Sequence, residues 1–147
     1  MTGTTNREKD AALGYLLLRA TLGINICIHG VSRILAGSSH FAETLVPAFQ
    51  HTPLPAGFVR LFALALPWAE SIVGLLVLVG IGTRIALVAG SLLILPLTFG
   101  ATLNQDWQSA GWQLIYATVY ALLLAFRYHN SFSADGLLQR NASKAGS

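Results

Sequence analysis

Four long hydrophobic runs, separated by short polar stretches, dominate the pattern of the chain. They lie near Ala12–Leu35, Val59–Ile81, Ile85–Leu103 and Gly111–Phe126. A helix of roughly 20 apolar residues crosses the hydrocarbon core of a bilayer, and each run comes close to or exceeds that length. The pattern predicts an all-α membrane protein: a four-transmembrane-helix bundle that forms one domain over residues 1–147, with polar tails at 1–10 and 130–147.

The one long connection, Gly37–Gly57, carries a pattern of its own. Phe41, Leu45 and Phe49 recur at helical spacing before the break at Thr52-Pro53-Leu54-Pro55. This spacing predicts a short amphipathic helix that lies in the outer membrane interface between the first two spans. The alternative is an ordinary loop with scattered apolar residues.

Composition supports the membrane prediction and excludes several classes of function. Hydrophobic residues make up 54% of the chain and charged residues 10%, whereas soluble domains carry about a quarter charged residues. The expected partners are membrane lipids and other membrane or peripheral protein subunits. The basic residues form no dense patch, so nucleic acid is not expected as a partner.

The basic residues also predict the orientation of the chain. If four spans are threaded, one side of the membrane receives Arg33 and Arg60, and the other receives the larger group, Arg7, Lys9, Arg84, Arg127, Arg140 and Lys144. By the positive-inside rule the larger group marks the cytoplasm. We therefore expect a multi-pass protein of the cell inner (cytoplasmic) membrane with both termini in the cytoplasm.

Polar side chains line one edge of the first span. Asn25, His29 and Arg33 follow one another at four-residue intervals, and Arg19 lies about 40° further round the helix. A polar stripe within the membrane must face protein or water. We expect it to pair with the second span, where Arg19 would meet Glu70 near the midplane.

Two interpretations of this Arg19–Glu70 pair stay open. It is either a purely structural ion pair or part of a polar pocket for a proton-coupled ligand. The pocket is plausible chemically because histidine titrates near neutral pH, so His29 can exchange protons.

The last span adds Tyr116 and Tyr120 on one helix face, below Trp112. The two tyrosines either hydrogen-bond within the bundle, the commoner use of a buried tyrosine, or contact a ligand. Pro67 and Pro96 fall near the middle of their spans, where each removes a backbone hydrogen bond, and kinks there would open a central cavity. The ligand and proton-handling candidates are Arg19, Asn25, His29, Glu70, Tyr116 and Tyr120, and a quinone headgroup is the flat, two-carbonyl ligand that such a set would suit.

No metal site and no covalently bound cofactor are expected. His29, His40 and His51 are spaced by eleven residues, but only His29 falls within a span and no carboxylate cluster joins them. Cys27 is the single cysteine, so no thiolate set for a metal or an iron–sulfur cluster exists.

The motif Arg19-x3-Gly23-x5-His29-Gly30-x2-Arg33, followed by Glu70-x3-Gly74 and Gly80-x-Gly82-Thr83-Arg84, resembles the DoxX-like membrane protein family. The resemblance extends weakly to Ser133-Ala134-Asp135-Gly136, although the family's preceding glycine-proline-glycine is absent and position 33 is Arg where the family often has Lys. It implies a bacterial four-helix membrane fold, whose members include the DoxD subunit of thiosulfate:quinone oxidoreductase. It also implies that Arg19, His29 and Glu70 handle a quinone headgroup or protons.

Three functions remain compatible with these patterns. The first is a quinone-interacting membrane subunit of an oxidoreductase, which needs a partner to supply electrons. The second is a non-catalytic scaffold or assembly subunit of a larger membrane complex. The third is a small transporter or channel, which four spans seldom form without oligomerisation. A quinone site predicts an open pocket near Arg19, Glu70 and Tyr120, whereas a scaffold predicts that these side chains saturate one another.

Overall fold

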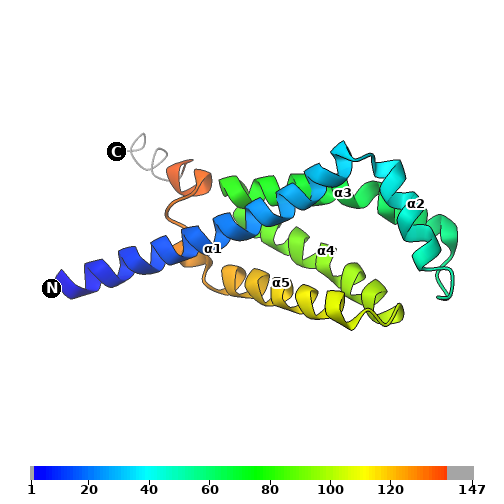
Figure 1. Cartoon of the computed structure of the whole chain (residues 1–147). Helices are drawn as coiled ribbons and strands as arrows, with labels where there is room; N and C mark the ends of the chain where they lie inside the picture. Colours follow the sequence, from blue (N-terminus) through cyan, green and yellow to red (C-terminus); the bar gives the residue numbers. More distant parts are fainter. Residues whose placement is uncertain (1, 139–147) are drawn as a thin grey trace.

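All regular structure in the part of the chain that is described is helical. The computed structural model describes the backbone of residues 2–138 and the side chains of residues 6–138. The elements are α1 (Thr2–Leu35), α2 (Ser38–Ala48), α3 (Ala56–Val79), α4 (Thr83–Leu103), α5 (Trp107–Ala125) and a short 3₁₀ helix, η1 (Arg127–His129) (Figure 1). The remainder of the C-terminal tail, with Arg140 and Lys144, lies outside the described residues.

Three of these helices are long and apolar enough to cross a membrane: the stretch Asn6–Leu35 within α1, all of α3 and all of α4. The fourth predicted span is confirmed as a helix, α5, but α5 is not among the three. The difference is one of composition, because α5 has 19 residues and carries Gln108, Ser109 and Gln113 in its first two turns. The chain is therefore a multi-pass helical membrane protein, with three helices that meet the requirement for a span.

Glycines allow α1 and α3 to approach until their backbones touch. A Cβ atom added to Gly74 of α3 would collide with the backbone of Cys27, and one added to Gly30 of α1 would collide with the Pro67 carbonyl and Ser71. Small residues at such crossings are the usual basis of close helix packing in membranes. The two helices accordingly run side by side (Figure 1).

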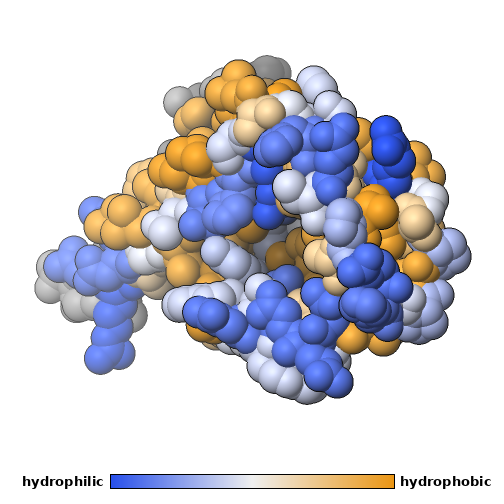
Figure 2. Space-filling model, turned by 45° about the vertical axis from the view of Figure 1, so that its right-hand side comes forward, coloured by the Kyte–Doolittle hydropathy of each residue, from blue (hydrophilic) through white to orange (hydrophobic). Residues whose placement is uncertain are grey.

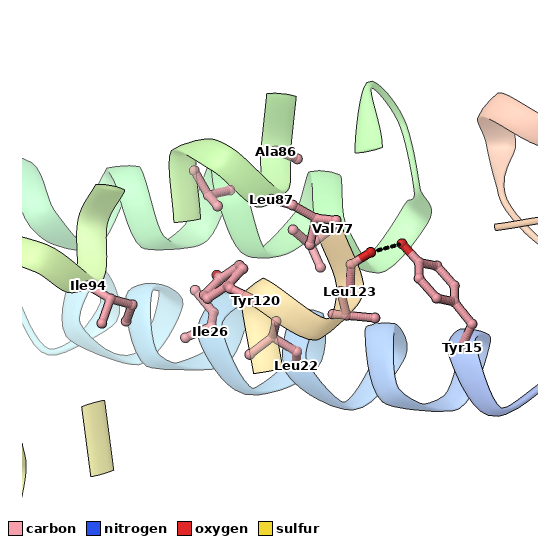
Figure 3. Packing of buried hydrophobic residues seen from close by; sticks show 10 residues of the cluster. Tyr15, Leu22, Ile26, Val77, Ala86, Leu87, Ile94, Tyr120 and Leu123 are labelled. Carbon is pink, nitrogen blue, oxygen red and sulfur yellow. Dashed lines mark hydrogen bonds between the residues drawn. The ribbon is translucent and has the colours of Figure 1, made fainter. Parts of the chain in front are cut away.

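The apolar core lies where α4 and α5 close against this pair. Figure 3 shows its buried side chains, among them Leu22, Val77, Leu87 and Leu123, which come from four different helices. The Tyr15 hydroxyl also reaches this cluster and donates a hydrogen bond to the Leu123 carbonyl at 3.1 Å. The core thus joins the N-terminal half of α1 to the end of α5.

Both tails contain helical structure in the part of the chain that is described. The N-terminal helix begins at Thr2, because Arg7, Glu8 and Lys9 favour helix and extend one that is already nucleated. After η1 the chain returns to the bundle, and residues 134–138 form one more helical turn.

The helix predicted between the first two spans exists as α2. Its apolar residues Phe41, Leu45 and Phe49 are half-buried toward the protein and Ala42 is buried, whereas Glu43 and Thr44 are exposed.

Candidate functional site

Glu70 pairs with Arg33, and the predicted Arg19–Glu70 pair is wrong. One guanidinium nitrogen of Arg33, Nη1, lies 2.5 Å from Glu70 Oε2. The antiparallel register of α1 and α3 explains the error: Arg19 lies beside Leu78, eight residues or about 12 Å along α3 from Glu70. Arg33, nearly three turns beyond Gly23 and close to the end of α1, is the arginine that lies level with the carboxylate.

The other polar residues of the α1 stripe gather beside this pair. The Tyr116 hydroxyl donates to Asn25 Oδ1 at 3.0 Å, which ties α5 to α1. The His29 ring nitrogen Nδ1 lies 3.0 Å from the Asn25 carbonyl oxygen, and a carbonyl can only accept, so Nδ1 carries a proton. In the neutral ring, Nε2 is then left with an acceptor lone pair.

These groups line a pocket of about 460 Å³, which we call the polar pocket. Of the predicted site residues, Asn25, His29, Glu70 and Tyr116 lie in its wall, together with Arg33 of the predicted stripe. Ser109 and Gln113 were missed as site residues, although both lie on the Trp112 side of α5. The full lining is Asn25, Ile26, His29, Arg33, Glu70, Ile94, Leu97, Ser109, Trp112, Gln113 and Tyr116.

Two features of the polar pocket leave hydrogen-bonding capacity for a ligand. Arg33 carries five N–H donors, and among the described residues the structure records one of them in use, toward Glu70. Gln113 Oε1 is buried without a hydrogen-bond partner in the same part of the chain. Gln113 Oε1 is therefore an acceptor that the described residues leave free.

Arg19 lies outside the polar pocket and has a different set of partners. Its guanidinium donates to the carbonyls of Val77 (2.5 Å), Leu78 (2.7 Å) and Phe132 (2.8 Å), and the side chain is 1% exposed. It therefore fastens the end of α3 and the returning C-terminal segment to α1.

Tyr120 is likewise not part of the polar pocket. Its ring packs directly on Gly90 of α4, where any Cβ atom would overlap it, and the side chain is 1% exposed. The residue fills the core between α4 and α5 (Figure 3).

The returning C-terminal segment caps α4. The Asp135 carboxylate accepts hydrogen bonds from the backbone N–H groups of Gly82 and Thr83, both at 2.8 Å. Burial of Asp135 raises the pKa of its carboxyl, but these hydrogen bonds and the nearby Arg19 guanidinium lower the pKa by more, so it lies below its ordinary value. The motif around Gly82 and the weaker motif around Asp135 thus meet through these hydrogen bonds.

A second pocket, of about 450 Å³, adjoins the first beneath α2, and we call it the apolar pocket. Arg33 lies in the walls of both pockets, and its guanidinium carbon is 4.6 Å from the centre of the Phe41 ring of α2. Figure 2, in which the end of the molecule carrying α2 comes forward, shows hydrophilic residues gathered around a hollow in this face.

The arrangement presents hydrogen-bond donors and acceptors to the space of the polar pocket. The polar pocket offers unused guanidinium donors, carboxylate and amide acceptors and an imidazole. The pair of Arg33 and Glu70 carries no net charge, so a neutral ligand suits the pocket better than an ion does.

Comparison with known proteins identifies the family. No curated protein and no solved structure matches the chain. The family model described as DoxX matches residues 14–104, which is more than half of the chain and runs from α1 to the end of α4. The match includes Arg19, Arg33 and Glu70. The chain therefore belongs to the DoxX family.

Proposed function

We propose that the protein is an integral membrane subunit of a quinone-linked redox complex and binds a quinone headgroup in the polar pocket. The observation that carries the proposal is the position of the Arg33–Glu70 pair in a pocket wall, beside His29. Ionisable residues within a membrane are costly, and those that pair with one another and face a cavity typically mark a ligand or ion site.

The chemistry of the pocket matches both forms of such a ligand. A quinone presents two carbonyl acceptors, which the free N–H groups of Arg33 can meet. The reduced quinol presents two hydroxyl donors, for which Glu70 and Gln113 Oε1 are acceptors. Reduction takes up two electrons and two protons, and His29 and Glu70 are groups that can pass protons to the ring.

A partner protein must supply the electrons. In the sequence, His29 is the only histidine within a predicted span, so one chain lacks the two facing axial ligands that a bundle haem requires. The proposal therefore places the protein within a larger complex in the bacterial inner membrane.

We propose further that α5 forms the fourth span and that both termini are cytoplasmic. Exposed Leu114, Ile115 and Leu122 give α5 an apolar outer surface. Arg84 at the start of α4 and Arg127 after α5 lie at the end of the bundle toward which the start of α1 extends (Figure 1). In this orientation α2 lies at the outer interface and the polar pocket opens in the outer half of the membrane.

The binding test uses the tryptophan in the pocket wall. In a Trp68→Phe, Trp107→Phe background, Trp112 is the one remaining tryptophan, and a quinone bound beside it should quench its fluorescence. Titration in lipid nanodiscs should give saturable quenching, with a Kd raised at least about tenfold, or 1.4 kcal/mol, by Arg33→Gln. Arg60→Gln is the matched control, because Arg60 is exposed and outside both pockets. Quenching that never saturates, or that both variants change equally, would contradict the proposal.

A non-catalytic scaffold is the second candidate, favoured by one observation. Arg19 and Tyr120 were predicted for the quinone site. Instead, Arg19 bonds to backbone carbonyls at the end of α3, and Tyr120 packs in the core. If the protein is a scaffold, Glu70→Gln should leave electron transfer by an assembled complex unchanged and alter stability alone. Loss of quinone reduction by a fully assembled complex that carries Glu70→Gln would contradict the scaffold function.

A further inference from the structure

The apolar pocket is built around one face of α2. Phe41, Leu45 and Ala48 lie at intervals of four and three residues, so they project from the same side of the helix, and they line the pocket together with Phe49, the residue that follows α2. Phe62 of α3 and Phe99 of α4 close it from the opposite side. The lining is mostly apolar and α2 forms one of its walls; Asn104 and Asp106 are the polar residues that line this pocket alone.

This space continues directly into the polar pocket. Four residues line both: Arg33, Leu97, Ser109 and Gln113. Arg33 stands at the junction, with its guanidinium bonded to Glu70 and lying against the ring of Phe41. The combined cavity is polar at one end and apolar at the other, which is the shape of an amphiphile with a compact head and a long tail.

We infer that the apolar pocket holds the hydrocarbon tail of the quinone whose headgroup lies in the polar pocket, and that α2 selects ligands by their tails. The inference rests on the proposed function. Its own content is the path of the tail: the tail leaves the headgroup past Arg33 and runs under α2, not directly into the lipid.

The physical role of such a tail site is orientation. Lipid chains are as apolar as the pocket lining, so moving a tail from the bilayer into the pocket releases little hydrophobic free energy. A fixed tail path nevertheless aligns the ring, and obstruction of that path prevents the ring from seating. Blocking the apolar pocket should therefore weaken the binding of quinones that carry a tail and leave the binding of tail-less quinones unchanged.

Ala48 is the position from which to obstruct the path. It is exposed at the end of α2 and lines the apolar pocket, whereas Glu70 and His29 line only the polar pocket, so a larger side chain at Ala48 narrows the tail path away from the headgroup site. Ala48→Leu and Ala48→Phe make a graded pair, and the smaller change keeps the test available if the larger one fails to fold. Ala56→Phe is the matched control, because Ala56 is exposed at the start of α3 and lines neither pocket.

The experiment compares tail-less quinones with the same rings carrying a polyisoprenoid chain, for one benzoquinone and one naphthoquinone, by quenching of Trp112 in nanodiscs. Ala48→Phe should raise the Kd of the tailed ligand at least about tenfold and that of the tail-less ligand less than about twofold. Ala48→Leu should fall between, and Ala56→Phe should match the wild type.

Three results would overturn the inference. If Ala48→Phe changes neither Kd, the tail takes another path and the headgroup site stands. If a phospholipid co-purifies with the wild type, is lost in Ala48→Phe and leaves both quinone affinities unchanged, a lipid chain occupies the pocket. If no quinone of either kind binds the wild type, the proposed function itself fails.

Discussion

The Arg33–Glu70 pair allows a quantitative prediction about stability. Arg33 Nη1 and Glu70 Oε2 are 2.5 Å apart, and the two side chains are 29% and 8% exposed respectively. Removing Arg33 leaves an almost buried carboxylate without its partner, whereas removing Glu70 leaves an arginine that can still reach water. The two single variants should therefore differ in cost.

The magnitude follows from the environment of the pair. Two unit charges about 4 Å apart attract by roughly 4 kcal/mol at an effective dielectric constant of 20, and the partial exposure of Arg33 reduces this. Breaking a buried pair costs about 3–5 kcal/mol, because one charge stays unpaired. We expect about 3 kcal/mol for Arg33→Gln, about 1–2 kcal/mol for Glu70→Gln, and a coupling energy of about 1–2 kcal/mol in the double variant.

Reversible unfolding in detergent or bicelles measures these values. The cycle of Arg33→Gln with Glu70→Gln should be non-additive, with the double variant less destabilised than the sum of the singles. The control cycle combines Arg19→Lys with Glu70→Gln and should be additive within about 0.5 kcal/mol, because Arg19 bonds to carbonyls remote from Glu70. Coupling in the control cycle and none in the first would refute the assignment of the ion pair.

Three further predictions concern the stability of the fold. Gly74→Ala should destabilise the protein by about 1–3 kcal/mol, because the added Cβ atom meets the backbone of Cys27. Gly111 lies in open space on α5, so Gly111→Ala should be neutral or slightly stabilising. Thermal unfolding of the two variants measures the difference. Arg19→Lys should cost more than about 2 kcal/mol in the same assay, since one ammonium cannot reproduce a planar fork that meets three carbonyls; a loss below 0.5 kcal/mol, on the order of a surface change, would contradict this. The folded-state pKa of Asp135 is depressed, so its stabilisation is complete above the ordinary carboxyl value of 3.8 and is lost as the pH falls through that value toward the folded pKa. Asp135→Asn should remove this part of the acid dependence of stability, and an unchanged pH profile would show that the cap contributes nothing.

Helix periodicity predicted most of the fold because lipid imposes a simple length requirement. The third run was predicted to end at Leu103, and α4 does end there. The N-terminal extension of α1 was missed because polar residues give no hydrophobic signal, although they prolong a helix at little cost. The returning C-terminal segment depends on contacts such as Asp135 with Thr83, 52 residues apart, which periodicity does not contain.

The candidate site was predicted in its residue types and only partly in its partners. The α1 stripe correctly brought Asn25, His29 and Arg33 together, because one helix face is a local property. Pairing across helices depends on the register of α1 against α3. That register is set by the contact of Gly74 with Cys27. The sequence prediction instead estimated the depth of each residue in the membrane from its position within its own hydrophobic run, and it therefore placed the wrong arginine opposite Glu70.

Photo-crosslinking with an azido-quinone, followed by peptide mapping, tests the central claim most directly. The quinone site predicts label in two segments that are far apart in sequence, α1 between Asn25 and Arg33 and α5 between Ser109 and Tyr116, with competition by unlabelled quinone and loss in Arg33→Gln but not in Arg60→Gln. Label spread over the exposed apolar surfaces and unaffected by competitor would contradict a quinone site in this pocket.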